Sequence, residues 1–124
     1  MPPLFLVMLG GAIGAGLRHQ VSAIMLRLTG PGFPWGTWSV NLLGGLLMGM
    51  LAAFVTRQTD GEHLRLFLGA GVLGGFTTFS AFSLETFDML VRGQHFLATA
   101  YAVSSVTGSV LMVVAGVYLF RALA

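Results

Sequence analysis

The stretch Leu66–Phe87, with the sequence LFLGAGVLGGFTTFSAFSLETF, decides how this chain folds. It is apolar over nearly its whole length and contains one charged residue, Glu85, close to its end. A helix of about 20 mostly apolar residues crosses a hydrocarbon core of ~30 Å, so the stretch is long enough to span a membrane. Its middle contains two glycines and two threonines, which are poor helix formers. We therefore predict a membrane-spanning helix that is broken near mid-membrane.

Three further apolar runs of sufficient length flank this stretch, at residues 4–26, 38–56 and 96–120. Hydrophobic residues make up 56% of the chain and charged residues only 8%, and a soluble domain needs several times more charge to cover its surface. No basic residue precedes Arg18, so the first run is predicted to be a retained span rather than a cleaved signal peptide. We expect one all-α domain over residues 1–124, in a multi-pass protein of the cell inner (plasma) membrane.

Charge and composition exclude several classes of protein. The net charge is +2, and all six basic residues are arginines scattered along the chain, so they form no contiguous basic face for a nucleic acid. Arginines beside membrane spans are typical of contacts with lipid headgroups. There is no cysteine, which excludes thiolate metal sites and thiol nucleophiles. The three histidines lack metal-ligand spacing and no acid–base or nucleophile pair lies within the spans, so we do not expect an enzyme.

The arginines also bear on orientation in the membrane. With four spans, both termini and the loop at 57–65 lie on one side, and the two other connections lie on the opposite side. The first side carries Arg57, Arg65 and Arg121, and the second carries Arg27 and Arg92, with Arg18 as a candidate third. Orientation follows the arginine imbalance of short loops, so this near-tie predicts insertion in both orientations. The alternative, that a single arginine or the loop decides the orientation, stays open.

Glycine is concentrated inside the predicted spans, where pairs such as Gly10/Gly14, Gly45/Gly49 and Gly71/Gly75 have GxxxG spacing. This spacing lets helix backbones approach closely in lipid, so we predict tight packing between the spans. Four closely packed helices leave no room for a water-filled path, and a transport function then requires an oligomer. With insertion in both orientations, an antiparallel homodimer is the economical assembly.

Polar residues inside the spans are candidates for function. Asn41 is the one amide in the second run, with Thr37 one turn earlier on the same face; such an amide serves either as a link between helices or as a substrate contact. Tyr101, Ser105 and Ser109 recur at every fourth position of the fourth run and form a hydroxyl stripe. The alternative for each serine is a bond to its own i−4 carbonyl.

The third run adds an aromatic pair beyond its predicted break. Phe79 and Phe82 are three residues apart and face the same way on a helix, flanked by Ser80 and Ser83. A phenylalanine pair in a membrane helix is usually packing or lipid contact. Its position next to an unwound segment favours a functional reading, because backbone groups exposed at that depth are tolerated only inside protein or along a cavity.

The chain resembles the Fluc/CrcB fluoride channel family in three segments: Gly10–Arg18 (GGAIGAGLR), Gly36–Gly49 (GTWSVNLLGGLLMG) and Gly69–Ser83 (GAGVLGGFTTFSAFS). The resemblance in motif, order and spacing covers essentially the whole chain, and the pattern GGxTTFSxFS on the third of four spans is specific. One departure is Ala81, where family members often carry threonine, and it removes a hydroxyl from the expected path.

The resemblance implies an antiparallel, dual-topology homodimer with two pores, each built from both subunits, that conducts fluoride passively. By position in the motifs, it implies that Phe79, Phe82 and Asn41 line the pore and that Tyr101, Ser105 and Ser109 form a polar track beside it. It further implies a structural sodium ion held by the backbone carbonyls of Gly74 and Thr77, where an unwound helix needs partners for its carbonyls. Glu85 falls near one pore end, and Arg18 matches a first-span arginine expected to be structural.

The chemistry of these residues suits fluoride. Fluoride is strongly hydrated, so a pore must replace its water with close donors. Asn41 supplies N–H groups, the serines supply O–H groups, and phenylalanine offers an electropositive ring edge that holds an anion weakly. Neutral HF crosses lipid and ionises inside the cell, and a negative-inside potential then drives the anion outward through a passive pore. The expected partners are therefore fluoride, membrane lipid and a second copy of this chain.

Two other classes are weighed against this function. A small dual-topology proton-coupled exporter has a similar length, but it needs an acid deep in its first span, and the first carboxylate here is Asp60, in a predicted loop. A structural membrane subunit would explain the glycine packing. It would give no reason for Asn41 or for the predicted break in the third span.

Overall fold

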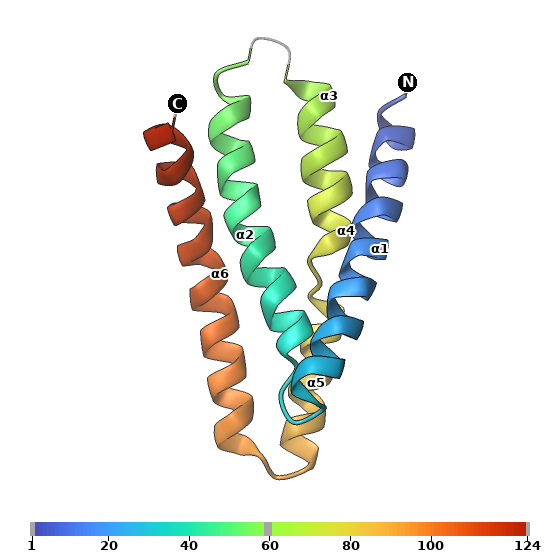
Figure 1. The fold of residues 1–124 in the computed structure, drawn as a ribbon, viewed down its shortest axis with the longest axis vertical. Helices are drawn as coiled ribbons and strands as arrows, with labels where there is room; N and C mark the ends of the chain where they lie inside the picture. The colour runs from blue at the N-terminus through green and yellow to red at the C-terminus, as the bar shows by residue number, and fades with distance from the viewer. Residues whose placement is uncertain (1, 59–60, 124) are drawn as a thin grey trace.

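The computed structural model describes residues 2–58 and 61–123, and the described part of the chain contains helices and no strands. Thr59 and Asp60, in the predicted polar loop, lie outside the described residues. In chain order the helices are α1 (Pro3–Thr29), α2 (Trp35–Val55), α3 (Glu62–Leu64), the π-helix η1 (Arg65–Leu73), α4 (Gly74–Phe76), α5 (Ser80–Val91) and α6 (His95–Leu123) (Figure 1).

Four of the helical stretches described are long and apolar enough to cross a membrane: Pro3–Thr29, Trp35–Val55, Glu62–Val91 and His95–Leu123. The prediction of four membrane-spanning helices is confirmed. Most of the helix ends lie beyond the predicted apolar runs, because a helix continues past the hydrocarbon core until a residue such as Pro34 or Gly30 stops it. α2, for example, begins directly after Pro34 rather than at the predicted Trp38.

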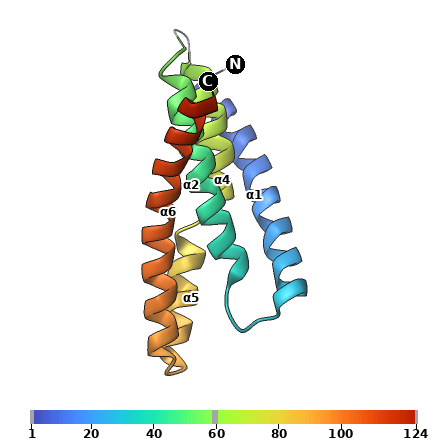
Figure 2. The ribbon, with the colours of Figure 1, turned by 60° about the vertical axis from the view of Figure 1, so that its left-hand side comes forward.

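The four spans run side by side along the long axis of the molecule (Figure 1). The start of α1, the ends of α2 and α6 and the short helix α3 lie at one end of the bundle, and the connections α1–α2 and α5–α6 lie at the other, which we call the loop end. α2 packs along α6, and α1 packs along η1 and α4, as the turned view also shows (Figure 2). The bundle is therefore two helix pairs joined through α2.

The third span changes backbone geometry twice along its length. Its first part, η1, is a π-helix in which Gly74 N donates to Gly69 O, one residue further back than in an α-helix. Helical structure then stops at Phe76, Thr77 is extended with φ −84° and ψ 160°, and the helix resumes at Ser80. Glycine and β-branched threonine gain little from a helical backbone, so this segment adopts another conformation at low cost.

Backbone atoms of neighbouring helices contact the glycine faces, as the glycine spacing predicts. A methyl group added at Gly14 would overlap the carbonyl of Val72, and one added at Gly49 would overlap the carbonyl of Val113. A methyl group at Gly75 would lie 2.5 Å from the Gly11 carbonyl oxygen. Side chains at these positions would push the helices apart, so glycine is what permits this close packing.

Candidate functional site

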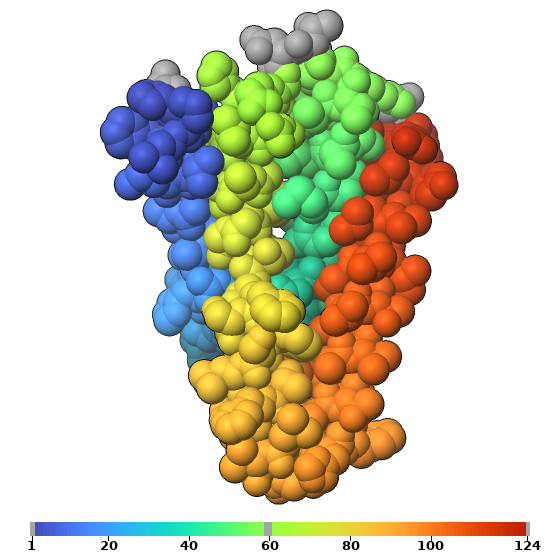
Figure 3. Space-filling model, turned by 180° about the vertical axis from the view of Figure 1, so that it is seen from behind, coloured from blue at the N-terminus to red at the C-terminus, as the bar shows by residue number. Residues whose placement is uncertain are grey.

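A cavity of about 420 Å³ opens on the side of the bundle between the third span and α6. In the space-filling view the surface is hollowed there, and α2 is visible behind the recess (Figure 3). We call it the central cavity. Among its lining residues are six of the predicted site residues, contributed by α2, the third span and α6: Asn41, Thr77, Phe79, Phe82, Ser105 and Ser109.

Asn41 clamps the extended segment of the third span. Its Nδ2 donates to the carbonyl of Thr78 at 2.9 Å, and the N–H of Thr78 donates to Asn41 Oδ1 at 2.8 Å. The amide thus satisfies both backbone groups of a residue outside the helix, which is the linking role considered for Asn41. This bond uses one of the two N–H groups of the side chain, and Asn41 also lines the central cavity, so a second role as a donor to a ligand is compatible with the first.

The clamp has a consequence for the backbone carbonyls around it. In an α-helix the carbonyl of residue i accepts from the N–H of residue i+4. The N–H of Thr78 is taken by Asn41, and the N–H of Ala81 donates to Thr78 Oγ1 at 3.2 Å. The carbonyls of Gly74 and Thr77 have therefore lost their usual i+4 donors.

The neighbouring carbonyl, that of Gly75, has a side-chain partner. Arg18 Nε in α1 donates to it at 3.1 Å. A guanidinium placed where a helix ends stabilises the negative end of the helix dipole. The charge of Arg18 thus lies beside the interruption of the third span, away from either end of the bundle.

The two predicted aromatic residues lie together. The rings of Phe79 and Phe82 are 5.7 Å apart between centroids, and Phe82 is 5.1 Å from the ring of Tyr101. Phe82 is partly buried, but Phe79 is 76% exposed, and both line the central cavity. The wall of the cavity on this side is thus open within a single chain.

The hydroxyl stripe of α6 divides into two parts. Ser105 and Ser109 line the central cavity, and Tyr101, which is fully buried, does not. Ser105 is 4% exposed, and its hydroxyl has no hydrogen-bond partner in the described part of the chain. The alternative of a bond to its own helix is therefore not realised. A buried hydroxyl without a partner is costly, and it marks a place where a ligand or water completes the site.

Glu85 has two partners inside the bundle that the sequence analysis did not identify. Its Oε2 accepts from Thr37 Oγ1 at 3.1 Å, and its Oε1 accepts from the Tyr101 hydroxyl at 3.0 Å. The carboxylate therefore joins α2, α5 and α6 at one point. The signal available in the sequence was that Glu85 is the one charged residue of its predicted span.

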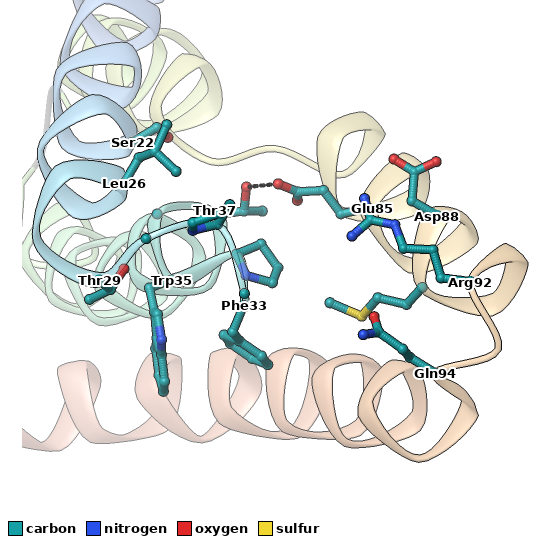
Figure 4. A pocket seen from close by; sticks show the side chains of 16 residues that line it. Ser22, Leu26, Thr29, Phe33, Trp35, Thr37, Glu85, Asp88, Arg92 and Gln94 are labelled. Atoms are coloured by element: carbon teal, nitrogen blue, oxygen red, sulfur yellow. Dashed lines mark hydrogen bonds between the residues drawn. The ribbon is translucent and has the colours of Figure 1, made fainter.

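A second cavity, of about 310 Å³, lies at the loop end, and we call it the loop-end cavity (Figure 4). Thr37 and Glu85 line it from inside the bundle. Phe33, in the α1–α2 connection, lines it as well and packs edge-on against Tyr101 at 5.2 Å.

Four of the predicted site residues are not brought into the central cavity of this chain, namely the buried Tyr101 and three exposed residues. Ser80 and Ser83 are exposed in the first turns of α5, and Gly74 is exposed on the third span. The first turn of α5 follows an extended segment, so its orientation depends on the backbone path at Thr77 and not on helical spacing from Phe76.

Comparison with known proteins places the sequence among relatives along its whole length. Residues 5–117 match the family described as CrcB-like protein, Camphor Resistance (CrcB). The fluoride-specific ion channel FluC of Sphingopyxis alaskensis is 53% identical over 124 residues, covering 99% of this chain and 98% of that protein. Proteins of the same name from Novosphingobium aromaticivorans and Mesorhizobium japonicum are 49% and 44% identical, covering 95% and 97% of each chain respectively.

Proposed function

This chain belongs to the CrcB family, and from that premise we propose that it is a fluoride-selective, passive ion channel. It is an ion channel and not an enzyme, and it is a multi-pass membrane protein, which in a bacterium lies in the inner membrane. Its relatives at 44–53% identity carry the name fluoride-specific ion channel, and they match this chain over almost its full length.

The observation that carries the proposal is the hydroxyl of Ser105 at the wall of the central cavity, which has no hydrogen-bond partner among the described residues. A small anion in the cavity would accept from this hydroxyl. Asn41, which has a second N–H group, and Ser109 line the same cavity and can supply further donors. The rings of Phe79 and Phe82 add electropositive edges, which attract an anion without a full positive charge.

Because these contacts are weak, they favour a site that conducts an anion over a site that binds it tightly. A lysine or arginine in the wall would hold an anion strongly, and a conducting site must let its ion leave. None of the residues that line the central cavity is charged. A proton-coupled exporter is not favoured, because α1 carries no carboxylate that could exchange a proton within its span. A purely structural role gives no reason for a buried Ser105 hydroxyl that has no hydrogen-bond partner among the described residues.

Fluoride efflux from proteoliposomes tests the function directly. Vesicles loaded with potassium fluoride should lose fluoride when valinomycin clamps the potential, without any proton gradient, and chloride-loaded vesicles should keep their content. A fluoride-selective electrode reports the first, and a chloride electrode reports the second. A requirement for a proton gradient would indicate an exporter, and the absence of fluoride flux would reject the proposal.

We propose further that the working unit is an antiparallel homodimer with two pores. The 76% exposure of Phe79 supports this assembly, because a ring in a fluoride path needs a second wall, which a partner subunit could supply. The arginine distribution supports insertion in both orientations. Arg18 lies at the interruption of the third span and belongs to neither end. Arg57, Arg65 and Arg121 at one end therefore oppose Arg27 and Arg92 at the other, a difference of one arginine.

If the chain inserts in both orientations, a single thiol at either end of the bundle should be accessible to a reagent from both sides of the membrane. The chain has no cysteine, so Arg27→Cys at the loop end and Gln58→Cys at the opposite end each introduce one thiol. In intact cells, a membrane-impermeant maleimide should label about half of each variant, and lysis should expose the rest. Complete labelling of one variant with none of the other would reject dual insertion.

We also propose a structural sodium ion held by backbone carbonyls at the interruption of the third span. The Gly74 and Thr77 carbonyls fit such an ion, because both have lost their i+4 donors, and hard cations prefer oxygen ligands. A bound cation would satisfy these oxygens and place a positive charge near the anion path.

Prolonged exchange of sodium for N-methyl-D-glucamine should destabilise the assembly. We expect size-exclusion chromatography with light scattering to show fewer dimers of the detergent-solubilised protein, and readdition of sodium to restore them. Because a buried ion exchanges slowly, the time course should extend over days. Equal dimer yields with and without sodium throughout this period would exclude a structural role for the ion.

A further inference from the structure

The loop-end cavity is connected to the hydroxyl stripe of α6 by a chain of hydrogen bonds. Thr37 and Glu85 line this cavity, and Glu85 accepts from both Thr37 and Tyr101. One turn along α6 from Tyr101 is Ser105, which lines the central cavity. The Glu85 carboxylate, which lines the loop-end cavity, thus accepts from a residue one turn away from the wall of the central cavity. An anion that leaves the central cavity along α6 would reach the loop-end cavity next.

The charges of the loop-end cavity oppose an anion at this point. Two carboxylates line it, those of Glu85 and Asp88, which are three residues apart on α5. The one cation among its lining residues is Arg92, at the end of the same helix. Without Arg92, a fluoride ion in the cavity would meet two negative charges and no positive one, and clefts of one sign exclude ions of that sign.

The position of Arg92 suits it to offset these carboxylates. In Figure 4 its side chain extends from the end of α5 toward Glu85, while the carboxylate of Asp88 points away from the Glu85 carboxylate. Arg92 forms no ion pair with Glu85 or Asp88, so neither carboxylate takes its guanidinium donors. The Glu85 carboxylate, in contrast, already accepts a hydrogen bond from the Tyr101 hydroxyl. Fluoride on the same path would need that hydroxyl as a donor. A guanidinium in the same cavity offsets part of the repulsion between these carboxylates and an anion.

We propose that the loop-end cavity is the outer vestibule of the fluoride path and that Arg92 sets its charge for passage of an anion. The inference rests on the proposed function and adds a site and a residue to it. Arg92 acts by offsetting the Glu85 and Asp88 carboxylates as fluoride crosses between the vestibule and the α6 stripe. Its contribution is therefore one of charge, and a different side chain of the same charge should replace it.

Charge-selective modification of a single thiol tests this role in the full-length protein. Arg92→Cys, reconstituted as folded protein, is treated on both sides of the vesicle with a methanethiosulfonate that adds either a trimethylammonium or a sulfonate group. Arg27→Cys is the matched control, because Arg27 is an exposed arginine near the loop end that does not line the cavity. Asp88→Asn provides the opposite change of charge within the same cavity.

We expect Arg92→Cys to lower the initial rate of fluoride efflux by about threefold to tenfold, at the low end of what charge in a cleft does to ion access. The trimethylammonium reagent should restore the rate, and the sulfonate reagent should lower it further. Asp88→Asn should raise the initial rate of fluoride efflux. In Arg27→Cys, neither reagent should change this rate.

Three outcomes would overturn the inference. Equal effects of both reagents would indicate a steric role, equal responses at positions 27 and 92 would indicate general surface charge, and unchanged flux in Arg92→Cys would leave Arg92 without a role. The failure of the wild-type protein to conduct fluoride in the same vesicles would instead count against the proposed function.

Discussion

Asn41→Leu is expected to abolish measurable fluoride flux. The substitution removes the amide donor at the central cavity and both bonds to Thr78. A hydrogen bond to a charged group is worth about 1.5–3 kcal/mol, which corresponds to roughly tenfold to a hundredfold in rate. Loss of the clamp adds to this effect, since each backbone group of Thr78 left without a partner costs about 1–3 kcal/mol. Together these losses predict a reduction of at least about a hundredfold.

Two further variants separate the clamp from the donor. Asn41→Asp keeps an oxygen for the Thr78 N–H but removes the amide N–H and adds a negative charge, so it should also stop fluoride while preserving the fold better than leucine does. Leu43→Ala, at an exposed position two residues along α2, is the control and should conduct normally. Efflux assays report the flux, and thermal unfolding in detergent reports the fold. Normal flux through Asn41→Leu would mean that the amide serves packing alone.

Phe82→Ile is expected to reduce fluoride flux about tenfold or more while changing stability little. Isoleucine keeps much of the bulk, and such hydrophobic exchanges usually cost less than about 1.5 kcal/mol. What it removes is the ring, whose edge faces an anion favourably and whose contacts with Phe79 and Tyr101 hold the wall of the central cavity. The measurement is again the initial rate of efflux, with chloride flux recorded beside it.

The matched control for Phe82→Ile is Phe87→Ile. Phe87 is an exposed residue of the same helix and lines neither cavity, so its replacement should leave flux and stability close to the wild-type values. If Phe82→Ile conducts as well as Phe87→Ile does, the aromatic ring has no part in the path. A rise in chloride flux in Phe82→Ile would assign selectivity, in addition to rate, to the ring.

The sequence by itself was sufficient for the four spans and for the close packing of their glycine faces. Both follow from local properties: the length of an apolar run sets whether a helix can cross the membrane, and glycine spacing along one helix sets how near another backbone can come. Helical periodicity likewise placed Ser105 and Ser109 on one face of the fourth span, and both line the central cavity.

Only the tertiary structure decided which polar groups pair. Thr78 lies 37 residues from Asn41, and Glu85 lies 48 residues from Thr37, so neither bond follows from spacing along a helix. The π-helical geometry of η1 and the extended backbone at Thr77 shift every later side chain of the third span, which is why Ser80 and Ser83 are exposed away from the central cavity. The burial of the Ser105 hydroxyl without a partner among residues 2–58 and 61–123, and the charges of the loop-end cavity, arise where several helices meet, and no single stretch of the sequence encodes them.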